Sequence, residues 1–161
     1  MQLPYSWSFD NTLKVYKFQS NNCSEYRVAL YEVGEMYFSN YPAIKALSYE
    51  IAFEPSVPPS RPDNKVSITI VDIVKSLLQD GKIITFICES VDGRQKSRHI
   101  LFRNWFKKHG DGFQKYDLEI CDDEHCYYLS LMLHTKKHSN GSTIFDVFQR
   151  AINEYSVIKN I

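Results

Sequence analysis

A short run of apolar residues constrains the fold more than any other feature of this sequence. Residues 83–88, Ile-Ile-Thr-Phe-Ile-Cys, carry apolar side chains at both odd and even positions. In a β-strand, successive side chains point to opposite faces of the sheet, so a strand of this kind needs cover on both faces. The run therefore predicts a strand inside a sheet that has packed layers on each side.

The segment before this strand, residues 5–54, alternates between apolar and polar side chains with a period of two. Such alternation is typical of strands with one packed face and one wet face. The alternating stretches are 13–18, 26–31 and 47–54. We expect them to form an antiparallel β-meander, together with a short strand at Met36–Ser39.

A proline-rich stretch, residues 55–65, follows the meander and holds four of the six prolines in the chain. Proline removes a backbone donor and fixes the backbone angle φ, so the stretch is predicted to be an internal loop. Neither side of the loop carries enough apolar residues for a core of its own. We therefore expect a single α+β domain that spans residues 1–161.

Helices and strands alternate after the loop. Apolar residues at helical spacing predict one helix that is capped by Ser67 and ends at Gly81, and a last helix that Ser142 or Thr143 caps. The remaining elements are a helix over 94–109 and strands over 113–120 and 126–133. The predicted fold class is α+β: an N-terminal antiparallel β-meander followed by α-β-α-β-β-α, with one sheet flanked by helices.

Composition narrows the classes of function. Lysine plus arginine total 19 and aspartate plus glutamate also total 19, which argues against binding nucleic acid by a large basic surplus. No apolar run reaches the ~20 residues of a membrane helix, and the N-terminus lacks the pattern of a signal peptide. We expect a cytoplasmic protein with no membrane contact, in which the four scattered cysteines are reduced.

The turn and helix that follow strand 83–88 are the candidate binding site. The first N–H groups of a helix attract anions, and arginine can hold a phosphate or a carboxylate through two hydrogen bonds. The candidate binding residues are Asp92, Arg94, Gln95, Arg98 and Trp105. No catalytic residue is assigned, because no phosphate loop or catalytic triad spacing accompanies them.

A structural interpretation of the same residues stays open. Asp92 and Arg94 would then pair within the turn, and Arg98 would form an internal ion pair with Glu50 or Glu54 of the meander. A charge on the apolar side of a helix needs such a partner. The burial and the partner of Arg98 distinguish a site from an ion pair.

Cysteine and histidine residues suggest no metal site and no cofactor. Cys121 and Cys126 flank His125 and three acidic residues, but structural zinc usually needs a second close pair of ligands. A hairpin turn is the preferred interpretation. His99 and His134 could serve as acid and base in a metal-independent ribonuclease, although nothing in the sequence brings them together.

Tyrosine is frequent in the meander, and tyrosine is enriched in protein interfaces. One interpretation is a surface for a protein partner or a homodimer, with tyrosines on both faces of the sheet. The other is ordinary core filling by a residue type that favours strands. The tyrosines concerned are Tyr16, Tyr26, Tyr31, Tyr37, Tyr41 and Tyr49.

The pattern FIC-x3-DGRQ-x2-R-x3-F-x2-WF, which starts at Phe86, resembles an uncharacterised family of small Bacteroidota proteins, a domain of unknown function. The resemblance implies a bacterial cytoplasmic setting and an association with toxin–antitoxin or phage-defence systems, and it brings no catalytic residue. The leading hypothesis is a protein-interaction module. The alternative is a metal-independent ribonuclease or another phosphate-handling enzyme, and the sequence does not decide whether the protein is an enzyme.

Overall fold

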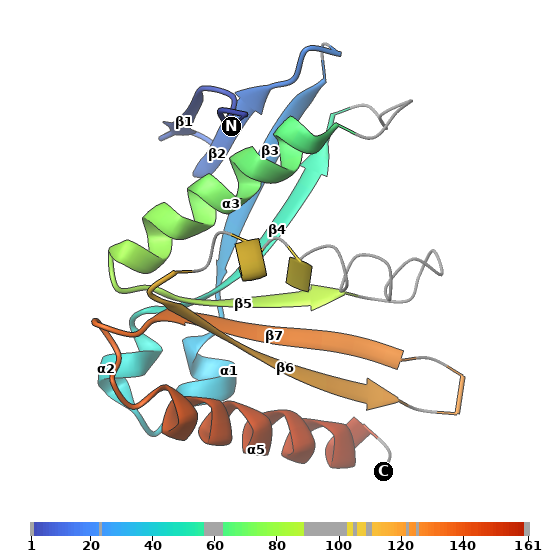
Figure 1. The fold of residues 1–161 in the computed structure, drawn as a ribbon. Helices are drawn as coiled ribbons and strands as arrows, with labels where there is room; N and C mark the ends of the chain where they lie inside the picture. The colour runs from blue at the N-terminus through green and yellow to red at the C-terminus, as the bar shows by residue number, and fades with distance from the viewer. Residues whose placement is uncertain are drawn as a thin grey trace.

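The computed structural model describes residues 2–22, 24–56, 63–88, 103–104, 106–108, 111–121, 123–124 and 126–159. They form one seven-stranded sheet with helices on both of its faces (Figure 1). The strands are β1 (Trp7–Asp10), β2 (Val15–Gln19), β3 (Glu25–Glu32), β4 (Ser48–Pro55), β5 (Ile83–Cys88), β6 (Phe113–Cys121) and β7 (Cys126–His134). The helices with assigned bounds are α1 (Gly34–Phe38), α2 (Pro42–Lys45), α3 (Asn64–Gln79) and α5 (Gly141–Lys159). The α+β class is confirmed.

The strands follow the order β1-β2-β3-β4-β5-β7-β6. Strands β1 to β4 pair antiparallel in sequence, so the predicted meander is confirmed. Strand β5 lies between β4, to which it is parallel, and β7, to which it is antiparallel. Ile83 and Ile84 on β5 are both fully buried although they point to opposite faces. The interior position, with cover on both faces, that the apolar run 83–88 predicted is therefore confirmed.

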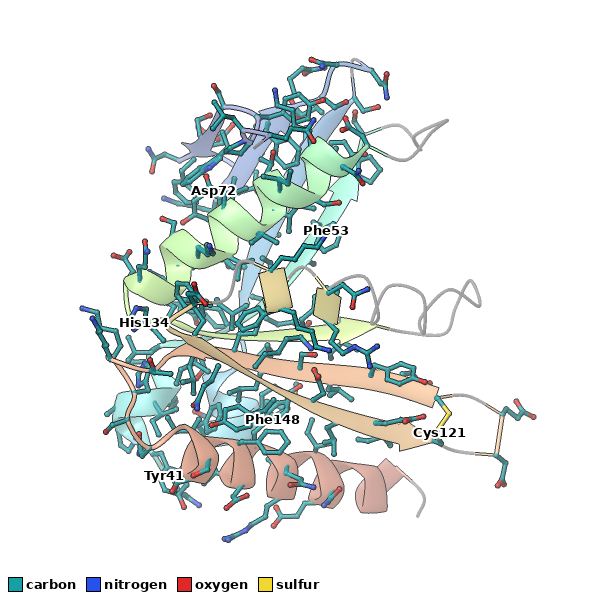
Figure 2. All side chains as sticks on the ribbon, viewed as in Figure 1. Tyr41, Phe53, Asp72, Cys121, His134 and Phe148 are labelled. Carbon is teal, nitrogen blue, oxygen red and sulfur yellow. A yellow bond between two sulfur atoms is a disulfide. The ribbon has the colours of Figure 1, made fainter. Side chains whose placement is uncertain are left out.

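The helices cover different parts of the sheet on opposite faces. Helix α3 runs along the meander (Figure 1), and its Ile73 belongs to a core cluster with Val28 of β3 and Ile51 of β4. Helix α5 packs with α1 against the other face of β5, β7 and β6, where Phe38 and Phe148 are fully buried. Figure 2 shows Phe148 on the α5 side of the sheet. Each face of the sheet therefore has its own apolar core.

Two hydrogen bonds fasten the N-terminal strand region to α3. The backbone N–H of Tyr5 donates to Thr69 Oγ1 at 2.8 Å, and the indole N–H of Trp7 donates to Asp72 Oδ2 at 2.7 Å. Both acceptors lie on α3, more than 60 residues away in sequence. The meander and α3 are thus held together by polar contacts as well as by a shared core.

The ends of the helices differ in part from the prediction. Asp63 caps α3 by accepting a hydrogen bond from the N–H of Lys65 at 2.9 Å, so the predicted cap at Ser67 is wrong. Gly81 follows α3 with a φ of 87°, which confirms it as the end of the helix. The N–H of Ile144 donates to the carbonyl of Asn140, which places the residues 142 and 143 inside α5 rather than at its cap.

The predicted strand at Met36–Ser39 is wrong, because Met36, Tyr37 and Phe38 belong to α1 and Ser39 is the C-cap of this helix. Tyr37 and Phe38 are adjacent in sequence and both are buried, against α5. A strand would send two neighbouring side chains to opposite faces, whereas a helix can turn both toward the same partner. Among the described helices, none combines the length and the apolar character needed to cross a membrane.

Candidate functional site

A small apolar pocket lies between α3 and the sheet, with an enclosed volume of about 40 Å³. Four strands and α3 contribute to its wall. The side chains that shape it most are Phe53, Ile70, Val74, Phe86, Phe113 and Met132. Phe53 of β4 stacks on Phe86 of β5 with their ring centroids 6.0 Å apart. Small-ligand sites are usually several times larger, so the enclosed part of this pocket has room for a few atoms only.

Two lysines reach the pocket from opposite sides. Lys75 comes from α3, and its Nζ lies 5.9 Å from the ring centroid of Phe113. Lys115 comes from β6, where its side chain is only 7% exposed and forms an ion pair with Asp117. Ser130 on β7 donates a hydrogen bond to Asp117 Oδ1 at 2.6 Å. The polar side of the pocket is therefore a lysine–aspartate–serine cluster.

The electrostatic surroundings of the two lysines differ. Lys115 and Asp117 balance each other, so that pair carries no net charge. Among the described residues, no carboxylate forms an ion pair with Lys75.

The same face of the β6–β7 hairpin carries further polar groups toward its tip. Tyr128 lies opposite Glu119 in the register of the two strands. Partial burial, the nearby charge of Glu119 and the hydrogen bond from Tyr128 to Glu119 all raise the pKa of the Tyr128 hydroxyl above its usual value of 10.0. This tyrosine therefore stays protonated at neutral pH and serves as a hydrogen-bond donor.

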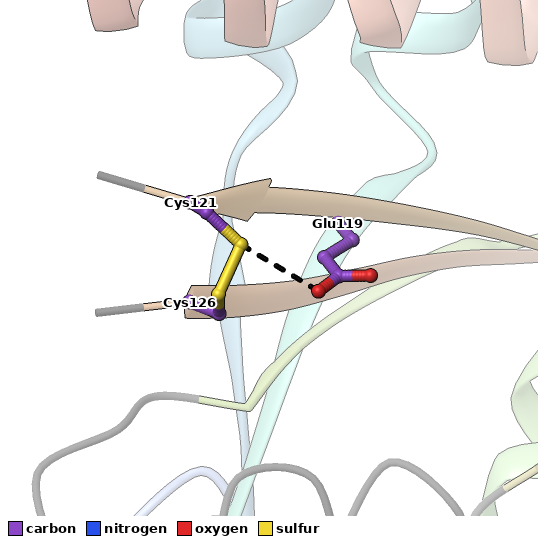
Figure 3. Close-up of side chains that lie close together, drawn as sticks. All are labelled: Glu119, Cys121 and Cys126. Carbon is purple, nitrogen blue, oxygen red and sulfur yellow. Dashed lines mark hydrogen bonds between the residues drawn. A yellow bond between two sulfur atoms is a disulfide. The ribbon is translucent and has the colours of Figure 1, made fainter. Parts of the chain in front are cut away.

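A disulfide closes the hairpin tip between Cys121 and Cys126, whose Cα atoms are 4.1 Å apart (Figure 3). The expectation of reduced cysteines is wrong for these two. Glu119 Oε1 lies 3.5 Å from Cys121 Sγ, but a disulfide sulfur has no proton to donate, so this is a hydrogen bond only in the thiol form. Although these three residues lie close enough to share a metal ion, disulfide sulfurs are not the thiolates that zinc requires.

The predicted binding residues lie outside the described residues. They are Asp92, Arg94, Gln95, Arg98 and Trp105. The last residue of β5 before them, Cys88, pairs with Tyr128 of β7. The choice between a binding site and an internal ion pair of Arg98 stays a prediction.

The described histidines serve local contacts. His138 Nε2 is hydrogen-bonded to the carbonyl oxygen of Gly81 at 2.7 Å. His134 (Figure 2) accepts a hydrogen bond at Nδ1 from the N–H of Lys136. The ring of His134 also packs edge to face against the ring of Phe113. His99, the other histidine of the ribonuclease hypothesis, lies outside the described residues. In the described part of the chain, no pair of histidines converges on a cleft.

Most of the meander tyrosines fill the core. Tyr16, Tyr26 and Tyr49 pack in the cluster beneath α3, and Tyr37 packs edge to face on Phe148. Tyr31 is 56% exposed and points to the opposite face of the meander. Both faces of the meander therefore carry tyrosine, but the described neighbours of Tyr31 on its face are charged or small. The neighbours are Lys17, Arg27, Ala29, Glu50 and Ala52. A partner surface on the meander stays a prediction.

The comparisons with known proteins identify a family for this chain. Residues 62–150, more than half of the 161 residues, match the family of unknown function DUF6169. No curated protein matches the chain. The resemblance to a domain of unknown function is confirmed, and the match includes α3 and the β6–β7 hairpin but not the meander. The chain belongs to the family of unknown function DUF6169.

Proposed function

We propose that the protein is a cytoplasmic protein-interaction module that forms a homodimer through β6. One observation carries the proposal: β6 is nine residues long and pairs with β7 on one side, while no described strand pairs with its other side. The backbone N–H and C=O groups along such an edge are a template for another strand. Addition of a strand to a sheet edge is a recurring mode of protein recognition.

The other edge strand, β1, suits this role less well. It has only four residues, and short edge strands are one way in which proteins prevent unwanted pairing. Strand β6 pairs with β7 in unbroken register from Phe113 opposite His134 to Cys121 opposite Cys126. It contains neither a bulge nor a proline, the devices that commonly disrupt an edge.

Charges along β6 favour a second copy of the same strand as the partner. Lys115, Asp117 and Glu119 lie on one face, because side chains two apart share a face. If Tyr116 lies opposite Tyr116 of a second antiparallel copy, each Lys115 lies opposite Asp117 of the other copy. Each pair of opposite charges in directly facing positions stabilises two paired strands by roughly 0.2–1 kcal/mol. The partner with matching chemistry is therefore the protein itself.

In many proteins, charged side chains on an edge strand prevent pairing with another molecule. The oligomeric state of the protein shows whether the charges of β6 prevent dimer formation or promote it. Size-exclusion chromatography with light scattering measures the mass of the native protein. We expect twice the 18.9 kDa chain mass at micromolar concentration. A monomer at every concentration tested would refute the proposal.

A pair of matched variants locates the interface. Tyr116→Lys places two lysines opposite each other at the centre of the proposed pairing, so it should produce monomers. Tyr127→Lys makes the same change on the same face but on β7, which is not an edge strand, and should leave the dimer intact. Circular dichroism establishes that both variants are folded. Equal effects of the two substitutions would place the interface elsewhere.

Hydrogen exchange tests the edge without any substitution. When the native protein is diluted until the dimer dissociates, the amides of β6 should exchange faster. The exchange rates of the β3 amides should not change, since β3 is paired on both sides. The bacterial setting that we propose, in a toxin–antitoxin or phage-defence system, is supported by the family resemblance alone.

A further inference from the structure

We propose that the tip of the β6–β7 hairpin is a metal site that oxidation switches off. When the disulfide is reduced, the thiolates of Cys121 and Cys126 and the carboxylate of Glu119 bind one thiophilic divalent cation, for which we expect Zn²⁺. The disulfide form does not bind the cation. The site uses side chains on one face of the hairpin and not the backbone edge of β6, so the proposal is independent of the proposed dimer.

The ligand atoms are already gathered at the hairpin tip. Cys121 lies directly opposite Cys126 in the register, with their Cα atoms 4.1 Å apart. Glu119 lies two residues before Cys121 and therefore on the same face of β6, and its Oε1 atom is 3.5 Å from Cys121 Sγ (Figure 3). The ligand atoms of the three residues all lie within 4.8 Å of one another. Two ligand atoms of one tetrahedral zinc ion are roughly 3.5–3.8 Å apart, so side-chain rotations are enough to form the site.

Tyr128 holds the carboxylate of the site in place. It lies opposite Glu119 in the register of β6 and β7 and donates a hydrogen bond to the Glu119 carboxylate. Carboxylates that bind metals are commonly oriented by a neighbouring donor of this kind. A carboxylate has room for several partners on its two oxygens, so the hydrogen bond from Tyr128 leaves Glu119 able to bind a cation.

The chemistry of the three ligands selects the metal. Thiolate sulfur favours Zn²⁺ and similar thiophilic cations, whereas Mg²⁺ and Ca²⁺ favour oxygen ligands. Three protein ligands leave the fourth tetrahedral position to water. Glu119 and Cys121 are exposed, so ions and reductants can reach the site from solvent. The spacing of cysteines and histidines does not reveal this set, because its third ligand is a carboxylate.

The disulfide and the cation compete for the same two sulfur atoms. A dithiol reductant breaks the S–S bond: the two sulfurs gain two electrons and two protons, and the reductant becomes a disulfide itself. Binding of Zn²⁺ then displaces one proton from each thiol. Hydrogen peroxide reverses the change, because it takes two electrons from the thiolates and, with two protons, becomes two molecules of water while the S–S bond forms and the cation leaves. The oxidation state of the hairpin tip therefore decides whether the metal is bound.

Titration with Co²⁺ tests the site, because bonds between Co²⁺ and thiolate produce charge-transfer absorption in the near ultraviolet. The full-length protein is reduced with a phosphine, separated from the reductant without oxygen and titrated. We expect this absorption to saturate at one Co²⁺ per chain and to disappear when Zn²⁺ displaces the probe. The oxidised protein, identical in sequence, should not show it. Absence of the absorption in the reduced protein, or equal absorption in the oxidised protein, would overturn the proposal.

Two pairs of cysteine substitutions locate the sulfur ligands among the four cysteines of the sequence. The double variant Cys121→Ser/Cys126→Ser should lose the Co²⁺–thiolate absorption. The matched double variant Cys23→Ser/Cys88→Ser should keep it. Circular dichroism establishes that both variants are folded, and the oxidised native protein provides the same comparison without a substitution. Absorption that the first variant keeps or that the second variant loses would contradict the assignment.

A matched pair of acid substitutions tests Glu119 as a ligand. Loss of a residue that only orients a metal ligand weakens metal binding by roughly 10–100-fold, so Glu119→Gln should weaken Zn²⁺ binding at least about tenfold. Asp123→Asn removes the same charge from an exposed position at the hairpin tip, outside the ligand cluster. Because exposed charges are screened, it should weaken binding less than about threefold. Competition with a chromophoric chelator measures both affinities, and equal affinities would refute the role of Glu119.

Discussion

Substitution of Gly34 by alanine tests the close approach of α1 and α2. An added Cβ at Gly34 would lie 2.0 Å from the carbonyl oxygen of Lys45 and 2.7 Å from its carbonyl carbon. Both atoms belong to the backbone, so no side chain can rotate away. Relief requires α1 or the end of α2 to move by more than an ångström in a region where Phe38 is fully buried.

The expected cost follows from the elements that would have to move. Overpacking of a core typically costs 1–3 kcal/mol, and a backbone clash places Gly34→Ala near the upper end, at about 3 kcal/mol. For a domain of this size, each kcal/mol lowers Tm by roughly 2–4 °C. We expect thermal unfolding, followed by circular dichroism, to show Tm lowered by about 6–12 °C.

Gly141 provides the control, because it also begins a helix. A Cβ there would meet the Oε1 atom of Gln114 and the Oη atom of Tyr116, each at 2.8 Å. These are the far ends of side chains and can move at low cost, so Gly141→Ala should change Tm much less. If the Gly34→Ala and Gly141→Ala variants have the same Tm, the close packing of α1 on α2 is refuted.

Two further predictions concern the hairpin disulfide and Asp10. A thiol reagent applied to the oxidised, denatured protein should count two free cysteines of the four in the sequence, and four free thiols would contradict the disulfide. Replacement of Cys121 and Cys126 by serine should lower the free energy of unfolding by at most about 2 kcal/mol, because the loop that the disulfide closes is short. The ion pair with Lys17 and the hydrogen bonds from backbone N–H groups, that of Leu13 first, lower the pKa of Asp10 to about 2. Because the folded pKa is below the unfolded value, the stabilisation is present above about pH 4 and is lost as pH falls toward 2. An NMR titration of the Asp10 carboxyl group with a midpoint near 3.8 would contradict this.

Local patterns in the sequence predicted most of the sheet. Alternation with a period of two identified β2, β3 and β4, and the unbroken apolar run identified β5 as an interior strand. These patterns are reliable because each reports directly which faces of a strand are packed. The short helix α1 was missed, since its apolar run of three residues, Met36 to Phe38, is too short to show a helical period.

The pocket cluster required information that local patterns do not contain. The sequence places Lys115 and Asp117 on one face of β6, but only the register of β6 against β7 brings Ser130 opposite Asp117. The same register brings Cys121 opposite Cys126, and a four-residue hairpin loop was the available signal for that disulfide. Lys75 next to the apolar stripe of α3 was visible in the sequence, but its proximity to Phe113 depends on the packing of α3 on the sheet.

The position of α3 has a consequence for the boundary of the shared family region. The matched stretch begins at residue 62, immediately before α3, yet the apolar stripe of this helix is sheltered by the meander that precedes it. A fragment limited to 62–150 would present Ile70 and Ile73 to water and lose the hydrogen bonds from Tyr5 and Trp7. The family boundary is thus not a folding boundary. A relative that lacks this meander must shelter the helix in another way, with a different N-terminal segment or with a neighbouring molecule.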